Sequence, residues 1–350
     1  MNIRSELEKH YIKIEENLFS SREEGYWSNL SKNESRSLVS SLTNIKTRDA
    51  INKFYPSLFD IIFSPKREAG LELLNLSGHE YCVDYGCMWG ALTIPLAKRC
   101  DYVLGIDQTM DSLRFLKIRA KEEELYNIDL LCTNIKKINI FQNKFDIAIV
   151  NGVLEWIPED GSIELKTYFG KFKRKKYKTS PIHQQVDFLN KLRENLSENG
   201  KLYLAIENRF DYKMFLGCRD PHTNLLFVSI LPRKVSDFIS LIVLGRPYVN
   251  WLYSFGGIKA LLEESGFSKI QLYMCFPDYR FPEHIIPFSG NFENFNPSIH
   301  LWNSDNSSEN MTKKYLKYIK RIVSKIAQIL IFKTLKLKIF ASSIIAIAQK

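Results

Sequence analysis

The stretch YCVDYGCMWG, residues 81–90, decides the fold of this chain. Its β-forming residues predict a strand that ends at Asp84, and Gly86 and Gly90 predict a tight turn before the helix-like run of residues 91–97. Such a turn presents free backbone N–H groups beside a glycine, a geometry that suits a nucleotide-like ligand. The sequence contains neither the G-x-G-x-x-G fingerprint nor a lysine-bearing phosphate loop.

Strand and helix patterns alternate outward from this stretch. From residue 80 onward their spacing is that of βαβ units, which predicts a parallel sheet with helices on both faces. A second strand, residues 101–107, ends in Asp107, 23 positions after Asp84. The carboxyl ends of neighbouring strands line one crevice, so Asp107 is placed to accept both hydroxyls of a ribose. Alternatively, it caps the helix that follows.

The acidic residue and two glycines of residues 84–90, with Asp107 at this distance, resemble the first motif of class I S-adenosylmethionine-dependent methyltransferases. The family's usual pattern is acidic-x-Gly-x-Gly-x-Gly, and Met88 stands at the middle glycine. The resemblance implies an α/β fold, a doubly wound Rossmann-like sheet of seven strands, with S-adenosylmethionine as cofactor. A βα turn of another doubly wound protein is the alternative interpretation, because a short glycine pattern is a weak signal.

The resemblance also implies where the cofactor binds. Asn134 follows a third strand whose end contacts the adenine in the family, which often has Asp there. Asn151 follows a fourth strand, residues 145–150, that ends at the same crevice. The expected cofactor-binding residues are Asp84, Gly86, Gly90, Asp107, Gln108, Asn134 and Asn151. Met88 and Asn134 depart from the family's pattern, so a domain that has lost activity and serves as a binding or scaffolding protein stays an alternative.

Three features after residue 200 sharpen the resemblance. The strand end Ile-Glu-Asn-Arg at 206–209, the nearby His222 and the run FPDYRFP at 276–282 are similar to a bacterial subgroup found with surface-polysaccharide and lipopolysaccharide biosynthesis. This implies an oxygen acceptor, a sugar of a surface glycan or of a lipid-linked glycan. Asp278 and Tyr279 either line the acceptor side or form a Pro-Asp turn.

Methyl transfer to a hydroxyl needs positioning and a base, and requires no metal. We predict His222 as the general base, with Glu207 and Arg209 orienting the acceptor; Glu207 and Glu155 are alternative bases. The competing interpretations are a structural histidine and an internal ion pair between Glu207 and Arg209.

Composition and cysteine usage point to a reducing cytoplasm. The 350 residues are 45% hydrophobic, enough for a sizeable core. Six scattered cysteines form no Cys-x-x-Cys pair, which argues against a zinc site and a disulfide framework. The chain shows no signal-peptide pattern and no uncharged apolar run of the roughly 20 residues that span a bilayer.

Positive charge is concentrated at the C-terminal end. Residues 311–350 carry ten Lys and Arg and no Asp or Glu, which accounts for the whole net charge of +10. Residues 311–338 include a basic amphipathic helix that either contacts an anionic membrane at its inner face or docks on its own domain. A second basic run at 171–178 is typical of a solvated loop or a nucleic-acid contact.

Nucleic acid is an unlikely partner by sequence, because the Asn/Asp-Pro-Pro-aromatic signature of base-amine methyltransferases is missing. An RNA or small-molecule methyltransferase stays a further alternative. We expect four segments: an N-terminal helical extension (1–70) that packs on the core or covers its ligand, the methyltransferase core (71–290), an insertion with the basic helix (291–338), and the last strand of the core (339–350).

Overall fold

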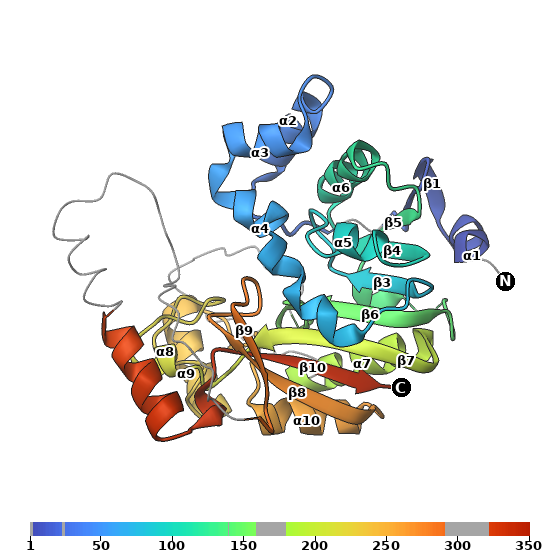
Figure 1. Cartoon of the computed structure of the whole chain (residues 1–350). Helices are drawn as coiled ribbons and strands as arrows, with labels where there is room; N and C mark the ends of the chain where they lie inside the picture. Colours follow the sequence, from blue (N-terminus) through green and yellow to red (C-terminus); the bar gives the residue numbers. More distant parts are fainter. Residues whose placement is uncertain (1–2, 23–24, 139, 159–179, 291–321) are drawn as a thin grey trace.

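The computed structural model describes residues 3–22, 25–138, 140–158, 180–290 and 322–350. Within these residues, ten strands form one sheet in the order β1-β2-β5-β4-β3-β6-β7-β10-β8-β9 (Figure 1). The strands are β1 (Ile12–Glu15), β2 (Leu18–Ser20), β3 (Tyr81–Tyr85), β4 (Tyr102–Asp107), β5 (Ile128–Cys132), β6 (Phe145–Asn151), β7 (Leu196–Glu207), β8 (Ser268–Phe276), β9 (His284–Pro287) and β10 (Ser343–Gln349).

The seven strands from β5 to β8 are the predicted core sheet. β5, β4, β3, β6 and β7 run parallel to one another. β10 lies antiparallel between β7 and β8, so the final strand is enclosed within the sheet. The prediction of a doubly wound α/β fold with a long connection before its last strand is confirmed.

Helices cover both faces of this sheet. The helices are α1 (Ile3–His10), α2 (Lys32–Ser41), α3 (Thr47–Phe54), α4 (Phe59–Phe63), α5 (Thr93–Ala97), α6 (Met110–Glu122), α7 (Pro181–Asn195), α8 (Tyr212–Phe215), α9 (Arg233–Leu244) and α10 (Phe255–Glu264). One core packs α1, α7 and α10 against the sheet, and a second packs α5, α6 and the 3₁₀ segment Pro65–Leu74 against the other face. The strands are buried on both sides, as the continuous apolar runs of parallel strands require.

The prediction that residues 1–70 are helical is wrong for residues 12–20. These residues form the hairpin of β1 and β2, and β2 pairs in parallel with β5 at the edge of the sheet. Leu18 and Phe19 are fully buried there, whereas the apolar side chains of β1 are exposed. The rest of the extension is helical, and α2, α3 and α4 enclose a small apolar core that includes Trp89 of the core domain.

The long connection between β8 and β10 is described only in part. β9 pairs with β8, and residues 322–334 form a helix close to α8, at the end of the molecule opposite β1 (Figure 1). Residues 311–321 of the predicted basic helix, and the basic run at 171–178, lie outside the described residues. Among the helices that are described, none has the length and apolarity to cross a bilayer.

Candidate active site

A cavity of about 580 Å³ opens at the carboxyl ends of the parallel strands. It lies where β3 separates β4 from β6, the point of strand-order reversal at which ligands of doubly wound sheets bind. Its volume is in the range of small-molecule and cofactor sites. Six of the seven predicted cofactor-binding residues line it: Asp84, Gly86, Asp107, Gln108, Asn134 and Asn151.

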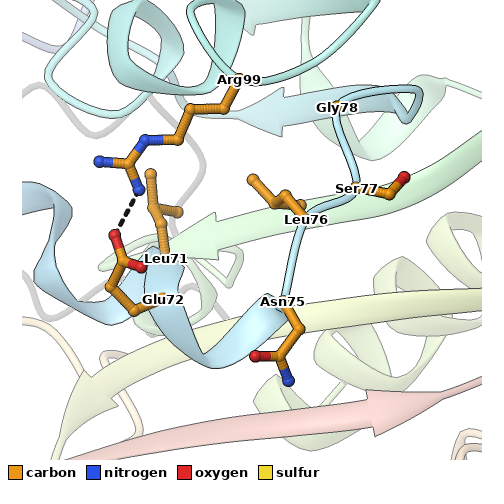
Figure 2. Close-up of a pocket in the computed structure, with 7 residues that line it drawn as sticks. All are labelled: Leu71, Glu72, Asn75, Leu76, Ser77, Gly78 and Arg99. Carbon is orange, nitrogen blue, oxygen red and sulfur yellow. Dashed lines mark hydrogen bonds and ion pairs between the residues drawn. The ribbon is translucent and has the colours of Figure 1, made fainter.

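A second cavity, of about 510 Å³, lies near the amino end of β3, away from these residues (Figure 2). Arg99, which lines this cavity, points toward Glu72. Its Nη1 lies 2.6 Å from Glu72 Oε1, and its Nη2 lies 2.7 Å from Glu68 Oε2. Because its cation is already neutralised and its lining contains none of the predicted site residues, we place the candidate site in the first cavity.

The turn after β3 depends on a left-handed backbone. Gly86 has φ +75°, and a Cβ at this position would lie 2.5 Å from Cγ2 of Val153. The backbone N–H groups of Gly86 and Cys87 both donate to the carbonyl of Ile106, at 2.8 and 3.1 Å, which ties the turn to β4. Met88 also has a positive φ, +47°, which is why the family prefers glycine there.

Met88 lies in the wall of the cavity and does not fill it. Its side chain also packs against the small core of α2, α3 and α4, and space for a ligand stays open beside Gly86. The departure from the family's pattern is therefore accommodated by the N-terminal extension.

Asp107 joins the two loops that border the cavity. Its Oδ2 accepts a hydrogen bond from the Met88 N–H at 3.1 Å, and its Oδ1 accepts one from the Thr109 N–H at 2.8 Å. Burial raises the pKa of Asp107 to about 6. A carboxylate can accept about four hydrogen bonds, so Asp107 would also accept ribose hydroxyls beside these contacts. The N-cap of α6 is Thr109, so Asp107 does not cap this helix.

Gly90 does not line the cavity, contrary to the prediction that it binds the cofactor. A Cβ on Gly90, at φ +80°, would lie 2.1 Å from Cδ1 of Leu116, so this glycine allows α6 to approach the turn. Asn134 does line the cavity, and its Oδ1 accepts a hydrogen bond from the Lys136 N–H at 3.0 Å.

Arg67 is a site residue that the sequence analysis missed. It comes from the 3₁₀ segment Pro65–Leu74 and lines the cavity. Its Nε and Nη1 atoms are buried and have no hydrogen-bond partner in the part of the chain that the structure describes. Burial lowers the pKa of Arg67, while its charge opposes the burial that raises the pKa of Asp84 to about 6. A buried guanidinium without acceptors fits a ligand carboxylate.

The N-terminal extension also closes one side of the cavity. Tyr26 and Trp27 line it, and Trp27 is held by Thr109, whose hydroxyl accepts from the Trp27 N–H at 3.0 Å and donates to its carbonyl at 2.8 Å. The Trp27 ring meets Trp156 edge-on, with centroids 5.3 Å apart. Part of the extension therefore lies against the ligand cavity, one of the two arrangements that we expected.

Glu155, Glu207 and His222 form a buried group, here called the acceptor cluster. They come from the loop after β6, the end of β7 and the loop after α8, and all three line the cavity. His222 Nε2 lies 3.7 Å from Glu155 Oε1, and the three side chains are at most 5% exposed. Trp156 stacks edge-on against the imidazole, with centroids 5.0 Å apart.

The electrostatics of the acceptor cluster favour a charged histidine. Burial alone would lower the pKa of His222, but the nearby carboxylates of Glu155 and Glu207 raise it to about 9. Burial and the charge of Glu155 raise the pKa of Glu207 to about 6. In the described residues, Glu155 Oε2 and Glu207 Oε2 have no hydrogen-bond donor. The cluster therefore contains two unsatisfied acceptor atoms, on residues that line the cavity.

The same three side chains are the described group that comes closest to a metal site, because one ligand atom from each lies within 4.8 Å of the others. The group already contains a cation, the imidazolium of His222, beside the carboxylate of Glu155. The expectation that no metal takes part stays a prediction.

Arg209 does not reach the cavity, contrary to the prediction that it orients the acceptor. Its Nε donates to the carbonyl of Ser229 at 2.7 Å, and its Nη2 donates to the carbonyl of Leu231. The neighbouring Asn208 donates to the carbonyls of Ile339 and Ala341 at 2.7 Å each. Both side chains fix loops around the end of β7, and no ion pair forms between Glu207 and Arg209 in the described structure.

Tyr279 and Arg280 line the cavity beside the acceptor cluster. The Tyr279 hydroxyl lies 3.4 Å from Glu207 Oε1, and Gly152, at φ +68°, leaves the space that this hydroxyl occupies. The Asp278 carboxylate accepts the N–H groups of residues 280 and 281, so it forms the turn that aims Tyr279 inward.

Part of the chain is similar in sequence to known methyltransferases. Residues 82–170 match the family model described as a methyltransferase domain. Ubiquinone biosynthesis O-methyltransferase of Bradyrhizobium diazoefficiens is 30% identical over 96 residues, which cover 27% of this chain and 37% of that protein. A 23S rRNA (uracil(1939)-C(5))-methyltransferase of Legionella pneumophila is 22% identical over 102 residues, covering 27% of this chain and 23% of that protein. The matched region thus spans less than two fifths of these curated relatives.

Solved structures were also compared. An S-adenosylmethionine-dependent methyltransferase from Archaeoglobus fulgidus aligns with a TM-score of 0.42 at 10% identity, covering 85% of this chain and all of that one. One from Aquifex aeolicus aligns with a TM-score of 0.39 at 16% identity, covering 63% of this chain and 88% of that one.

Proposed function

We propose that this chain, whose residues 82–170 match a methyltransferase domain, is a class I S-adenosylmethionine-dependent methyltransferase that transfers a methyl group from that cofactor to an oxygen acceptor. The observation that carries the oxygen acceptor is the acceptor cluster. Glu155 and Glu207 line the cavity, and each has one buried carboxylate oxygen without a hydrogen-bond donor in the described residues, which the hydroxyl of a bound acceptor would supply. Leaving such atoms unsatisfied costs about 1–3 kcal/mol each, which bound hydroxyls would recover.

The residues of the cavity fit the cofactor. Arg67 would hold its carboxylate through the two nitrogens that lack acceptors, and Asp107 would hold the ribose hydroxyls with its remaining lone pairs. Asn134 and Gln108 line the same cavity and would contact the adenine. The positive φ of Gly86 shapes the turn that borders the cavity, and its absent Cβ leaves the space that Val153 occupies.

S-adenosylmethionine would supply a methyl group already activated by a sulfonium. The protein's task is then to orient the acceptor and remove its proton. A carboxylate of the acceptor cluster would take the hydroxyl proton as the acceptor oxygen receives the methyl group and the sulfonium is released as the neutral thioether. No other reactant is needed.

Glu207 replaces His222 as our choice of base. With a pKa of about 9, His222 is protonated at neutral pH and holds no lone pair for the proton, whereas Glu207, with a pKa of about 6, is ionised there. The imidazolium instead keeps Glu155 and Glu207 from repelling each other in a buried space. Tyr279 orients the Glu207 carboxylate.

A sugar of a surface or lipid-linked glycan is the acceptor class that we favour. Carboxylates accept hydrogen bonds from vicinal hydroxyls, and the cavity adds the aromatic faces of Tyr26, Trp27 and Trp156. A cytoplasmic enzyme fits this proposal, because none of the six cysteines, all within the described residues, is in a disulfide.

The test has two steps. Calorimetric titration of the full chain with S-adenosylmethionine, and competition by S-adenosylhomocysteine, measures cofactor binding. Labelled methyl transfer is then measured to surface glycan and glycolipid from a strain that lacks the protein, with Glu207→Gln as the control. We expect binding by both proteins and transfer by the wild type alone. Binding without transfer to any hydroxyl acceptor would refute the oxygen acceptor.

Two alternatives are distinguished by the same measurements. A degenerate domain that serves as a scaffold, motivated by Met88 and Asn134, predicts no heat on titration with the cofactor. An RNA methyltransferase, the activity named for one of the matched relatives, predicts transfer to RNA that is lost on charge reversal at residues 171–178. Transfer to a small-molecule phenol or amine is measured in parallel.

A further inference from the structure

The helix of residues 322–334 buries polar side chains and exposes aliphatic ones, the reverse of an ordinary surface helix. Its buried side consists of Ser324, Gln328 and Phe332, at helical spacing, and the two polar side chains are hydrogen-bonded to the Tyr212 hydroxyl at 2.9 Å. Its outward side is aliphatic, with 41–60% of each residue exposed: Ile322, Val323, Ile326, Ile329 and Leu330. A surface helix normally buries its apolar stripe and exposes polar residues. Of the two arrangements that the sequence left open, packing of the apolar arc against its own domain is not found in the described residues.

The same inversion occurs in α9. Ser236 and Ser240 face the protein, and the Ser236 hydroxyl donates to the carbonyl of Val228 at 2.6 Å. The apolar residues at positions 235, 238, 242 and 243 are 42–65% exposed. Isolated exposed apolar side chains are ordinary, but two helices that present whole apolar faces indicate an interaction surface.

Positive charge accompanies the outward face of residues 322–334. Lys325 and Lys333 are exposed on this helix, and the segment that follows exposes Lys336 together with Leu335, Leu337 and Ile339. Residues 322–350 contain no Asp or Glu. We call residues 322–339 and the outward face of α9 the C-terminal apolar surface.

We propose that the C-terminal apolar surface lies on an anionic lipid bilayer, with its aliphatic side chains in the acyl boundary and its lysines at the phosphate groups. Aliphatic residues rimmed by lysines are the composition of interfacial helices. A second copy of this chain fits less well, because a two-fold contact through this surface would bring its lysines opposite one another. The proposal goes beyond methyl transfer and does not depend on it.

The test is flotation of the full-length protein with phosphatidylcholine vesicles, with and without phosphatidylglycerol. We expect flotation with the anionic vesicles and release by salt. The variant Ile326→Ser/Leu330→Ser removes two outward side chains, and Phe238→Ser/Ile242→Ser does the same in α9; each lowers the partition coefficient about tenfold or more. The matched control is Tyr126→Ser, which removes an apolar side chain that is 77% exposed outside this surface.

A charge variant tests the lipid class. Lys325→Gln/Lys333→Gln/Lys336→Gln lowers partition into anionic vesicles about 100-fold and abolishes the preference for them. All changed side chains are exposed, so circular dichroism and thermal midpoints stay those of the wild type. Wild-type protein that does not float, or serine variants that float like the control, would overturn the proposal. So would a dimer in light scattering that the serine variants dissociate, because the surface would then bind a second copy.

Discussion

Replacing Arg67 by methionine separates a ligand-binding arginine from a structural one. In the free protein, Arg67 is a buried cation with two nitrogens that lack acceptors. Desolvation of such an ion costs several kcal/mol, and methionine of similar length avoids that cost. We therefore expect Arg67→Met to leave the free energy of unfolding unchanged or to raise it by about 1 kcal/mol or more. Most substitutions of buried residues act in the opposite direction.

The same variant should bind the cofactor weakly. A hydrogen bond to a charged group contributes about 1.5–3 kcal/mol, so the loss of one bond to the cofactor carboxylate raises the Kd about 10- to 150-fold. 5′-Methylthioadenosine lacks the amino-acid portion, and its Kd should therefore be the same for the variant and the wild type. The assays are isothermal titration calorimetry with both ligands and urea unfolding without ligand.

Arg99→Met is the matched control, because Arg99 lines the other cavity and its charge is paired with Glu68 and Glu72 (Figure 2). It should leave the Kd of both ligands unchanged. The reasoning is refuted if Arg67→Met binds S-adenosylmethionine like the wild type and loses stability, since Arg67 would then be a structural residue.

Four further predictions concern the turn and the acceptor cluster. Gly86→Ala should destabilise the protein by more than Gly217→Ala. Both positions have a positive φ, which costs an alanine about 1–2 kcal/mol, but only at Gly86 would the new Cβ lie against Val153. Urea unfolding of both variants measures the difference in the free energy of unfolding. Glu207→Gln should lower kcat about 10²- to 10⁴-fold with an unchanged cofactor Kd, and an unchanged kcat would exclude Glu207 as the base. The rate of methyl transfer should rise with pH as Glu207 ionises near pH 6 and fall as His222 loses its proton near pH 9. Because the pKa of His222 is raised, its contribution to the free energy of unfolding is complete below about pH 6.5 and is lost as pH rises through about 9. His222→Gln should therefore flatten the alkaline limb of the rate profile and of the stability profile. Dialysis against a chelator should leave the rate of methyl transfer unchanged, and restoration of a lost rate by one divalent cation would contradict the assignment of the acceptor cluster to proton transfer.

The core of the fold followed from local sequence patterns. Continuous apolar runs that end at Asp84, Asp107 and Asn151 predicted strands whose ends meet at one crevice, and the structure places these three residues in one cavity. The prediction succeeds because parallel strands run in the same direction. Their carboxyl ends therefore lie at one edge of the sheet, which brings the residues at these ends together.

Contacts between distant segments were not predictable in this way. Arg67 and Trp27 reach the cavity from the N-terminal extension, whose pattern says nothing about where it packs. β2 has three residues, too few for a recognisable alternation, and owes its existence to pairing with β5. Arg209 follows β7 as predicted, but its guanidinium finds carbonyls in residues 229–231, a choice that no local pattern reveals.

Amphipathic spacing predicted a helix near the C-terminal end but left its orientation open. The pattern fixes which residues share a face, and the usual assumption is that the apolar face packs inward. Here Gln328 and Ser324 find a buried hydroxyl on Tyr212, so the polar face is satisfied inside and the aliphatic face is left outside.

The enclosed position of β10 determines when folding is completed. During synthesis the ribosome releases residues 343–349 after the other strands that the structure describes, yet these residues supply the hydrogen-bonding partners of both β7 and β8. Until then, two long apolar strands have open edges, which favour pairing with other chains. A nascent chain stalled before Ser343 should consequently depend on chaperones, and a C-terminal fusion should preserve the sheet only if its linker leaves Gln349 free to pair.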